Sequence, residues 1–390
     1  MRRLLVLAVV LATALLTAPT AVAAVPNWSG LDATAYAGPI GDSGTLIDSA
    51  PLDPAISLPG AGQAYRILYA TTNSHDQPAV STAAVFTPTG DAPEGGWPVV
   101  AWAHGTVGLG DDCTPSALPR SERDVEYLDH WLAQGYAIVA SDYTGLGTPG
   151  LMPYLDTVAT AHSIVDSVVA SRRTDLPLSP KWAVIGQSQG GAGALGTARY
   201  ATEFSAGSGL DYRGAIATGT PAFIEEIVAK AGPQMALPPG LGPIANAYAS
   251  YILAAFSDAR PDLDVEGVLT PAGREATDLA TTMCVRDLAA RLADKRPSDF
   301  FAAPLASVPG VEPALAAYMG IPVSGYDRPI FLGVGLQDRD VPPSSSLRLN
   351  DALRANGQPV ELRVYPDDDH SSTVLTSMRD STPFLARLMS

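Results

Sequence analysis

One serine of this chain stands in a pattern that could make it a nucleophile. The pentapeptide 186–190 (GQSQG) follows the apolar run 181–185 and precedes the small-residue run 192–200. A serine on a tight turn between a strand and a helix exposes its hydroxyl, and glycines flank it because the two backbones approach closely. We predict that Ser188 is the nucleophile of an acyl-transfer reaction. The alternative is a glycine turn with an incidental serine.

Chain order singles out one histidine that could activate this serine. A serine hydroxyl becomes a good nucleophile when a base takes its proton, and the base needs a third group to orient it. Of the five histidines only His370 follows Ser188, and it stands on a polar loop after the strand-like run 360–365. The order Ser, acid, His is typical of hydrolases with such a serine turn. We predict that His370 is the base; the alternative is a surface histidine in an acidic loop.

The acid that orients the histidine should lie between the two, at the end of a strand. Asp338 follows the apolar run 330–335 and is the first choice. Asp340, two positions on, is the alternative, because the sequence does not give the loop geometry. The aspartates at 367–369 are very close to His370 in sequence, so we interpret them as a solvated acidic turn.

Acyl transfer also needs hydrogen-bond donors for the oxyanion that develops. We expect the backbone N–H of Gln189, directly after the nucleophile, and that of Thr106, in the loop after the apolar run 97–103. Gly105 lets this loop approach a ligand closely. For His104 we expect a structural role, holding the loop by a hydrogen bond. This chemistry requires no metal ion and no organic cofactor, and we predict none.

The segments around these residues alternate between strand-like and helix-like patterns. Apolar runs bounded by turn residues predict strands at 64–71, 80–86, 97–103, 136–141, 181–185, 212–218, 329–335 and 360–365. Helical spacing predicts helices at 124–134, 157–172, 192–200 and 382–388. The residues before about 61 are interpreted as irregular. The alternation predicts the α/β class and an α/β-hydrolase fold, with a mostly parallel central sheet and helices on both faces.

One long segment does not fit this alternation. It carries helix-like stretches at 223–231, 243–256 and 274–291, separated by runs rich in proline and glycine. Because strands resume at 329, we predict a helical cap at 221–322 inserted into a core formed by 25–220 and 323–390. The alternative is an independent second domain.

The first 24 residues, 1–24, have the pattern of a secretory signal peptide. Arg2 and Arg3 precede an apolar run at 4–16, and small residues follow up to Ala24. The run is too short to span a bilayer comfortably, so we expect cleavage, secretion and no stable membrane anchor. Hydrophobic residues make up 46% and charged residues 16% of the chain, which favours a large buried core. The net charge of −16 repels phosphate backbones, so nucleic acid is not an expected partner. We expect a monomer.

The chain has two cysteines, Cys113 and Cys284. An even pair in an exported protein predicts a disulfide, and the alternative is two buried free thiols. A zinc site is disfavoured because neither cysteine has a second cysteine or a histidine at metal-ligand spacing.

Together these residues resemble the secretory lipase family, which includes the fungal lipase A type and many bacterial exported lipases. The matching pieces lie at 102–106, 113–116, 142–147 and 186–191, with the contexts of Asp338 and His370. The resemblance extends over about 64–370. It implies a carboxylic-ester hydrolase whose helical cap covers an acyl-binding tunnel, and it supports Ser188, Asp338 and His370 as the triad. The chain departs from fungal relatives, which carry more disulfides, and the cap is the least similar region.

We therefore predict a secreted lipase or esterase, similar to triacylglycerol lipases, that acts on a small-molecule or lipid ester through an acyl-serine intermediate. The rival enzymes are a serine peptidase and an acyltransferase that use the same triad. The rival from another class is a non-catalytic binding protein that kept the hydrolase fold. Such proteins typically lack a triad residue, whereas all three candidates are present here.

Overall fold

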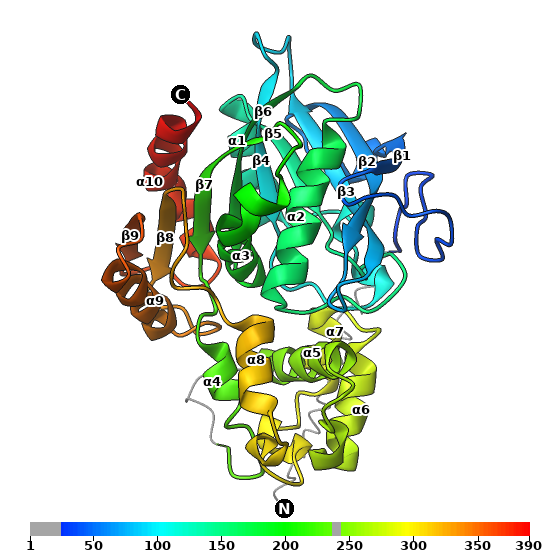
Figure 1. Ribbon diagram of the computed structural model, residues 1–390, viewed down its shortest axis with the longest axis vertical. Helices are drawn as coiled ribbons and strands as arrows, with labels where there is room; N and C mark the ends of the chain where they lie inside the picture. Colours follow the sequence, from blue (N-terminus) through cyan, green and yellow to red (C-terminus); the bar gives the residue numbers. More distant parts are fainter. Residues whose placement is uncertain (1–24, 236–242) are drawn as a thin grey trace, which may run out of the picture.

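A nine-stranded sheet forms the centre of the described chain (Figure 1). The computed structural model describes residues 25–235 and 243–390, so the predicted signal peptide at 1–24 lies outside the described residues. The strand order is β1-β2-β3-β5-β4-β6-β7-β8-β9. The strands are β1 (Leu46–Pro51), β2 (Ala61–Thr72), β3 (Pro78–Pro88), β4 (Trp97–Ala103), β5 (Ala137–Ser141), β6 (Leu178–Gln187), β7 (Asp211–Thr218), β8 (Ile330–Gly335) and β9 (Val360–Tyr365).

The six strands from β5 to β9 in this order pair in parallel, and β1, β2 and β3 add an antiparallel edge. The central parallel strands β4, β5 and β8 are buried along most of their length, which explains their nearly continuous apolar sequences. Along β4, Val99 and Ala101 face one hydrophobic core, and Val100 and Trp102 face the other. The predicted fold class, α/β with a mostly parallel sheet covered on both faces, is confirmed.

Helices cover both faces of the sheet (Figure 1). On one face lie α2 (Thr157–Ser171), α3 (Gln189–Phe204) and α9 (Pro343–Ala355). On the other lie α1 (Glu122–Ala133) and α10 (Ser372–Met389). This arrangement brings the loops that follow β4, β6, β8 and β9 to one edge of the sheet, where the carboxyl ends of parallel strands meet.

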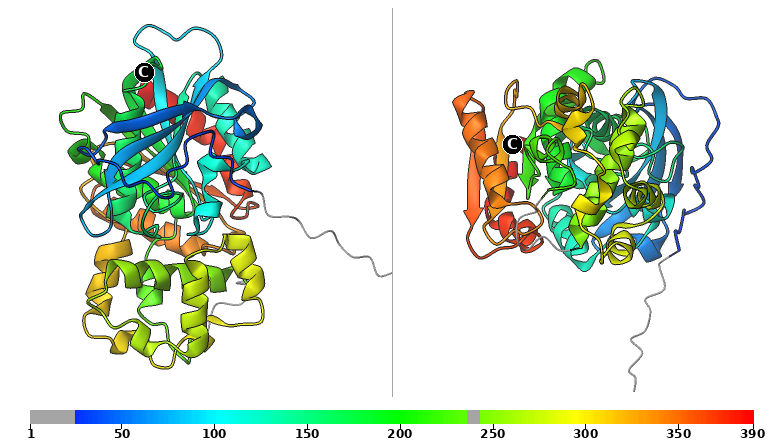
Figure 2. Two further views of the ribbon diagram at one scale, coloured as in Figure 1. Left: turned by 90° about the vertical axis from the view of Figure 1, so that its right-hand side faces the viewer. Right: turned by 90° about the horizontal axis from the view of Figure 1, so that it is seen from below.

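Between β7 and β8 the described residues form five α-helices that lie together beyond this edge of the sheet (Figures 1 and 2). We call α4–α8 the helical segment. Its members are α4 (Ile224–Val228), α5 (Ile244–Ala259), α6 (Pro271–Ala280), α7 (Val285–Arg291) and α8 (Val311–Met319). None of the helices in residues 25–235 and 243–390 is long and apolar enough to cross a membrane.

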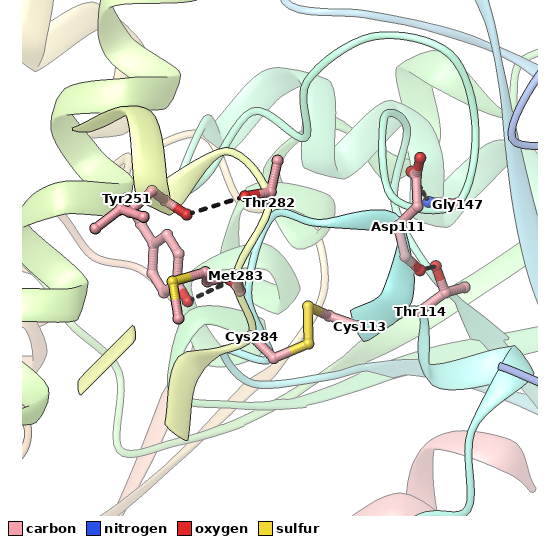
Figure 3. Close-up of a disulfide and its surroundings, with 9 residues drawn as sticks. Asp111, Cys113, Thr114, Gly147, Tyr251, Thr282, Met283 and Cys284 are labelled. Atoms are coloured by element: carbon pink, nitrogen blue, oxygen red, sulfur yellow. Dashed lines mark hydrogen bonds between the residues drawn. A yellow bond between two sulfur atoms is a disulfide. The ribbon is translucent and has the colours of Figure 1, made fainter. Parts of the chain in front are cut away.

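A disulfide between Cys113 and Cys284 ties the helical segment to the loop after β4 (Figure 3). The two chain stretches also pair through their backbones, because the N–H of Val285 donates to the carbonyl of Val107 over 2.8 Å. A Cβ on Gly110 would collide with the backbone of Thr282, so the contact is close along this whole stretch. The helical segment is thus fixed to the core beside the loop that carries Thr106.

Candidate active site

Ser188 occupies a strained turn between β6 and α3. Its φ of +60° lies in the left-handed region, where a residue with a side chain is uncommon outside functional sites. A Cβ at Gly186 would collide with the carbonyl of Gly190, and one at Gly190 would collide with that of Ala103. The glycines that the sequence places around the serine are therefore required by direct backbone contact. The N–H of Ser188 donates to Thr218 on the neighbouring β7 over 3.0 Å, which holds the turn to the sheet.

His370 is held by a carboxylate on the loop after β8. Its Nδ1 lies 2.6 Å from Oδ2 of Asp338, and the carboxylate is nearly buried. The other oxygen of Asp338 accepts hydrogen bonds from the N–H groups of Asp340 and Val341, at 2.9 and 2.8 Å. The carboxylate is thereby fixed from both sides. An imidazole whose Nδ1 faces a carboxylate keeps its Nε2 available for a nucleophile.

The alternative acid, Asp340, lies beside this pair without bonding the ring. Its backbone N–H donates a hydrogen bond to the carboxylate of Asp338, and Asp340 is one of the residues that line the cavity described below. Partial burial raises the pKa of the Asp340 carboxyl, and the nearby His370 ring offsets part of that rise.

Two contacts bring the histidine loop to the serine turn. The side-chain amide of Gln187, directly before Ser188, donates to the carbonyl of His370 over 3.2 Å. Gly219 follows Thr218, whose carbonyl accepts the hydrogen bond from Ser188. A Cβ on Gly219 would lie 3.0 Å from the His370 ring, so the ring packs close to this part of the backbone. Among the described residues no hydrogen bond joins the Ser188 hydroxyl to His370. Catalytic hydrogen bonds are often long until a substrate is bound.

Of the two expected oxyanion residues, Gln189 directly follows the serine, and Thr106 lies on a loop that passes beside it. The N–H of Gln189 is the first of α3 and donates to no carbonyl among the described residues. The loop with Thr106 passes close by, because a Cβ on Gly105 would lie 3.5 Å from Cβ of Ser188. The Thr106 hydroxyl forms a 2.7 Å hydrogen bond with the hydroxyl of Tyr154, a residue that the sequence analysis did not single out.

His104 lies in the core under this loop. Its ring nitrogens contact the carbonyls of Gly105 at 2.7 Å and Asp142 at 3.3 Å, and its ring stacks on Tyr143 at 4.3 Å. Burial lowers the pKa of His104. The hydroxyl of Tyr143 in turn donates to the His104 carbonyl over 3.0 Å. These contacts hold the loop and leave no ring nitrogen directed at the serine.

A cavity of about 170 Å³ lies between the serine turn and the helical segment. Ser188 and Gln189 form its floor, and the helical segment together with its adjoining loops supplies most of its wall. The wall is apolar apart from a few groups. The side chains from the helical segment and the adjoining loops are Pro221, Ile224, Ile227, Val228, Ala231, Met235, Ala245, Tyr248, Ala249, Ile252, Leu253, Pro297 and Phe301. Within the described residues, no cluster of three or more His, Cys, Asp or Glu side chains could hold a metal ion.

Several solved structures share this architecture. Candida antarctica lipase A in its closed state aligns over 94% of this chain and 85% of its own, with a TM-score of 0.73 and 19% identity. The rice cell wall degrading esterase LipA from Xanthomonas oryzae aligns over 87% of this chain and 98% of its own, with a TM-score of 0.70 and 21% identity. A putative hydrolase from Legionella pneumophila aligns over 88% and 98%, with a TM-score of 0.71 and 20% identity.

Sequence comparison adds a narrower match. Residues 314–389, which include Asp338 and His370, match the prolyl oligopeptidase family. No curated protein matches the sequence significantly. The shared architecture agrees with the resemblance to the secretory lipases and shows that this chain has the α/β-hydrolase fold of lipases and esterases.

Proposed function

We propose that this protein is a serine carboxylic-ester hydrolase, a lipase or esterase, with Ser188, His370 and Asp338 as its catalytic triad. The observation that carries the proposal is the strained serine turn at the floor of an apolar cavity, beside a histidine bonded to a buried carboxylate. Strain at a non-glycine residue is retained where the surrounding structure imposes it, most often at a functional site.

The reaction follows from these positions. Oγ of Ser188 attacks the ester carbonyl carbon while Nε2 of His370 takes the serine proton, and Asp338 stabilises the imidazolium. The carbonyl oxygen becomes an oxyanion, which accepts hydrogen bonds from Gln189 and Thr106. The carbon–oxygen bond to the alcohol then breaks, and His370 returns the proton to the leaving oxygen. A water molecule then attacks the acyl carbon while His370 takes its proton. The bond from this carbon to Oγ of Ser188 breaks, His370 returns the proton to Oγ, and the acid leaves.

The apolar cavity supports an acyl chain as the group bound next to the serine. An acyl chain bound in this cavity would exchange its contact with water for contact with aliphatic side chains such as Ile224, Val228 and Leu253. Burial of an apolar chain contributes about 25 cal/mol per Å². In this proposal the segment 221–322 acts as a cap that binds the acyl chain, and the alcohol leaves on the open side of the triad.

The proposal includes secretion. The sequence pattern at 1–24 is that of a cleaved signal peptide, and the disulfide between Cys113 and Cys284 suits an oxidising compartment. The substrate is then an ester met outside the cell.

The first test is hydrolysis of p-nitrophenyl esters from acetate to palmitate by the mature protein and by Ser188→Ala. We expect the wild type to hydrolyse the series and the variant to lose about 10⁶-fold in kcat, because the serine forms the covalent intermediate. The variant should keep the Tm and circular dichroism of the wild type.

Each other result has a definite meaning. An optimum at long chains supports a lipase, and an optimum at short chains supports an esterase with a small pocket. Full activity of Ser188→Ala would contradict the triad. Cleavage of peptide p-nitroanilides without ester hydrolysis would favour the peptidase alternative, to which the match of residues 314–389 with the prolyl oligopeptidase family points.

A further inference from the structure

The hydroxyl groups of Thr106 and Tyr154 form a pair beside the serine. Their oxygens lie 2.7 Å apart, and neither hydroxyl has another hydrogen-bond partner in residues 25–235 and 243–390. Two hydroxyl protons are present, and one of them is used within the pair. The pair therefore has one O–H left to donate to a third group.

The acidity of the two groups decides which proton stays free. A phenol is a better donor than an aliphatic alcohol, and the aliphatic oxygen is the better acceptor. Burial also raises the pKa of Tyr154, so its hydroxyl keeps its proton at neutral pH. This difference in acidity favours Tyr154 as the donor to Oγ1 of Thr106, which leaves the proton of Thr106 free.

The position of the pair determines what the free proton can reach. Tyr154 lines the same cavity as Ser188 and Gln189. Thr106 directly follows Gly105, where a Cβ would lie 3.5 Å from Cβ of Ser188, so this loop passes beside the serine. The substrate oxygen that becomes negative must sit at the N–H of Gln189, on the side of the serine that faces this loop.

We propose that the Thr106 hydroxyl is a side-chain donor to the oxyanion and that Tyr154 is a positioning residue that holds this hydroxyl in the donating orientation. The inference rests on the proposed ester hydrolysis and adds two groups to it. A hydroxyl fixed before the reaction stabilises the transition state without reorganisation, so it raises kcat more than it improves substrate binding.

The scaffold around Tyr154 is suited to hold it still. The loop ends at Asp156, whose carboxylate accepts from the N–H groups of Val158 and Ala159 at 3.0 Å. The Tyr154 ring packs edge-on against Tyr251 of α5, with centroids 5.6 Å apart. The hydroxyl of Tyr251 donates to the carbonyl of Met283 over 2.9 Å (Figure 3). Tyr251 is therefore a matched control, a buried tyrosine next to Tyr154 with its hydroxyl bonded elsewhere.

The test compares Tyr154→Phe, Thr106→Val, Thr106→Ser, their Tyr154→Phe/Thr106→Val combination and Tyr251→Phe on the best p-nitrophenyl ester. We expect Thr106→Val to lose about 100-fold in kcat, as other side-chain oxyanion donors do. Tyr154→Phe should lose about tenfold, the effect of one hydrogen bond. KM should change little in both. Thr106→Ser keeps a hydroxyl and should therefore lose much less kcat than Thr106→Val. Tyr251→Phe should keep the wild-type kcat, and the combined variant should match Thr106→Val alone.

A second readout separates positioning from a structural role. A trifluoromethyl ketone adds to the serine and forms a stable oxyanion, so its Ki should rise by the same factor as kcat/KM falls. The proposal is overturned if Tyr154→Phe keeps the kcat and Ki of the wild type, or if the losses of the two single variants multiply. A wild type that hydrolyses no ester would overturn the proposed function and this inference together, whereas an active wild type with an unaffected Tyr154→Phe variant overturns only the inference.

Discussion

Asp338 and Asp340 are two residues apart beside one histidine, and they differ in their hydrogen-bond partners and in their positions. Asp338 bonds Nδ1 of His370 and accepts two backbone N–H groups, whereas Asp340 faces the cavity. We expect Asp338→Asn to lower kcat by about 10⁴-fold, because an amide that donates to Nδ1 selects the wrong imidazole tautomer. Asp340→Asn should keep most of the activity. The kcat values of the two variants, measured side by side, check this, and the reverse order would make Asp340 the orienting acid.

The sequence alone allows candidate site residues to be named where chain order and turn residues point to them. Ser188, His370 and Asp338 could be named because each follows a recognisable strand. Tyr154 could not, because its contact with Thr106 joins two loops that are 48 residues apart in sequence. A tyrosine in a loop of prolines and glycines carries no periodic signal, and only the tertiary fold gives it a partner.

Among the elements, helix α2 contains a buried carboxylate away from the serine. Asp166 accepts a hydrogen bond from Thr71 of β2 at 2.8 Å, and Nδ1 of His162 lies 4.0 Å from it. Burial raises the pKa of Asp166 from 3.8 to about 7. Between these two values the folded chain holds a proton that the unfolded chain releases. The contribution to stability is therefore complete below pH 3.8 and declines as the pH rises to about 7.

The corresponding prediction concerns Asp166→Asn. The amide resembles the protonated carboxyl in size and cannot ionise, so the stability of the variant should lose this part of its pH dependence. We expect the Tm of the variant, relative to wild type, to be higher at pH 8 than at pH 5. Thermal unfolding at the two pH values measures this, with the exposed Asp175→Asn as control. An equal difference at both pH values would show that Asp166 is ionised throughout.

The sequence predicted helices and strands well where their residues are continuously buried. It predicted them less well where tertiary contacts determine the start or end of an element. The strands of the sheet centre were found because both of their faces are apolar. The expectation of an irregular chain before residue 61 was wrong for β1, a partly exposed edge strand without an apolar run. The predicted helix 274–291 is in fact α6 and α7, interrupted where Cys284 pairs with the loop after β4. Helix α10 begins at Ser372, ten residues before its predicted start.

At the scale of the whole molecule, a disulfide links the helical segment to the core in addition to the polypeptide backbone. The disulfide closes a loop between cysteines 171 residues apart, and loop closure of this length restricts the unfolded chain strongly. We expect the double variant Cys113→Ser/Cys284→Ser to unfold with about 2–5 kcal/mol less free energy than the wild type. Denaturant titration of both proteins measures the difference.

The same variant tests whether the bond also maintains the site. The backbone pairing of Val285 with Val107 remains without the disulfide, and it lies one residue from Thr106. If that pairing is sufficient, kcat below the unfolding transition stays at the wild-type value while stability falls. If the loop loosens instead, kcat falls with unchanged KM, because the oxyanion donors lose their fixed positions before substrate binding is affected. Limited proteolysis within 282–285 distinguishes the two cases, since only a loosened junction exposes this stretch to cleavage. A double variant as stable as the wild type would contradict the predicted contribution of the disulfide.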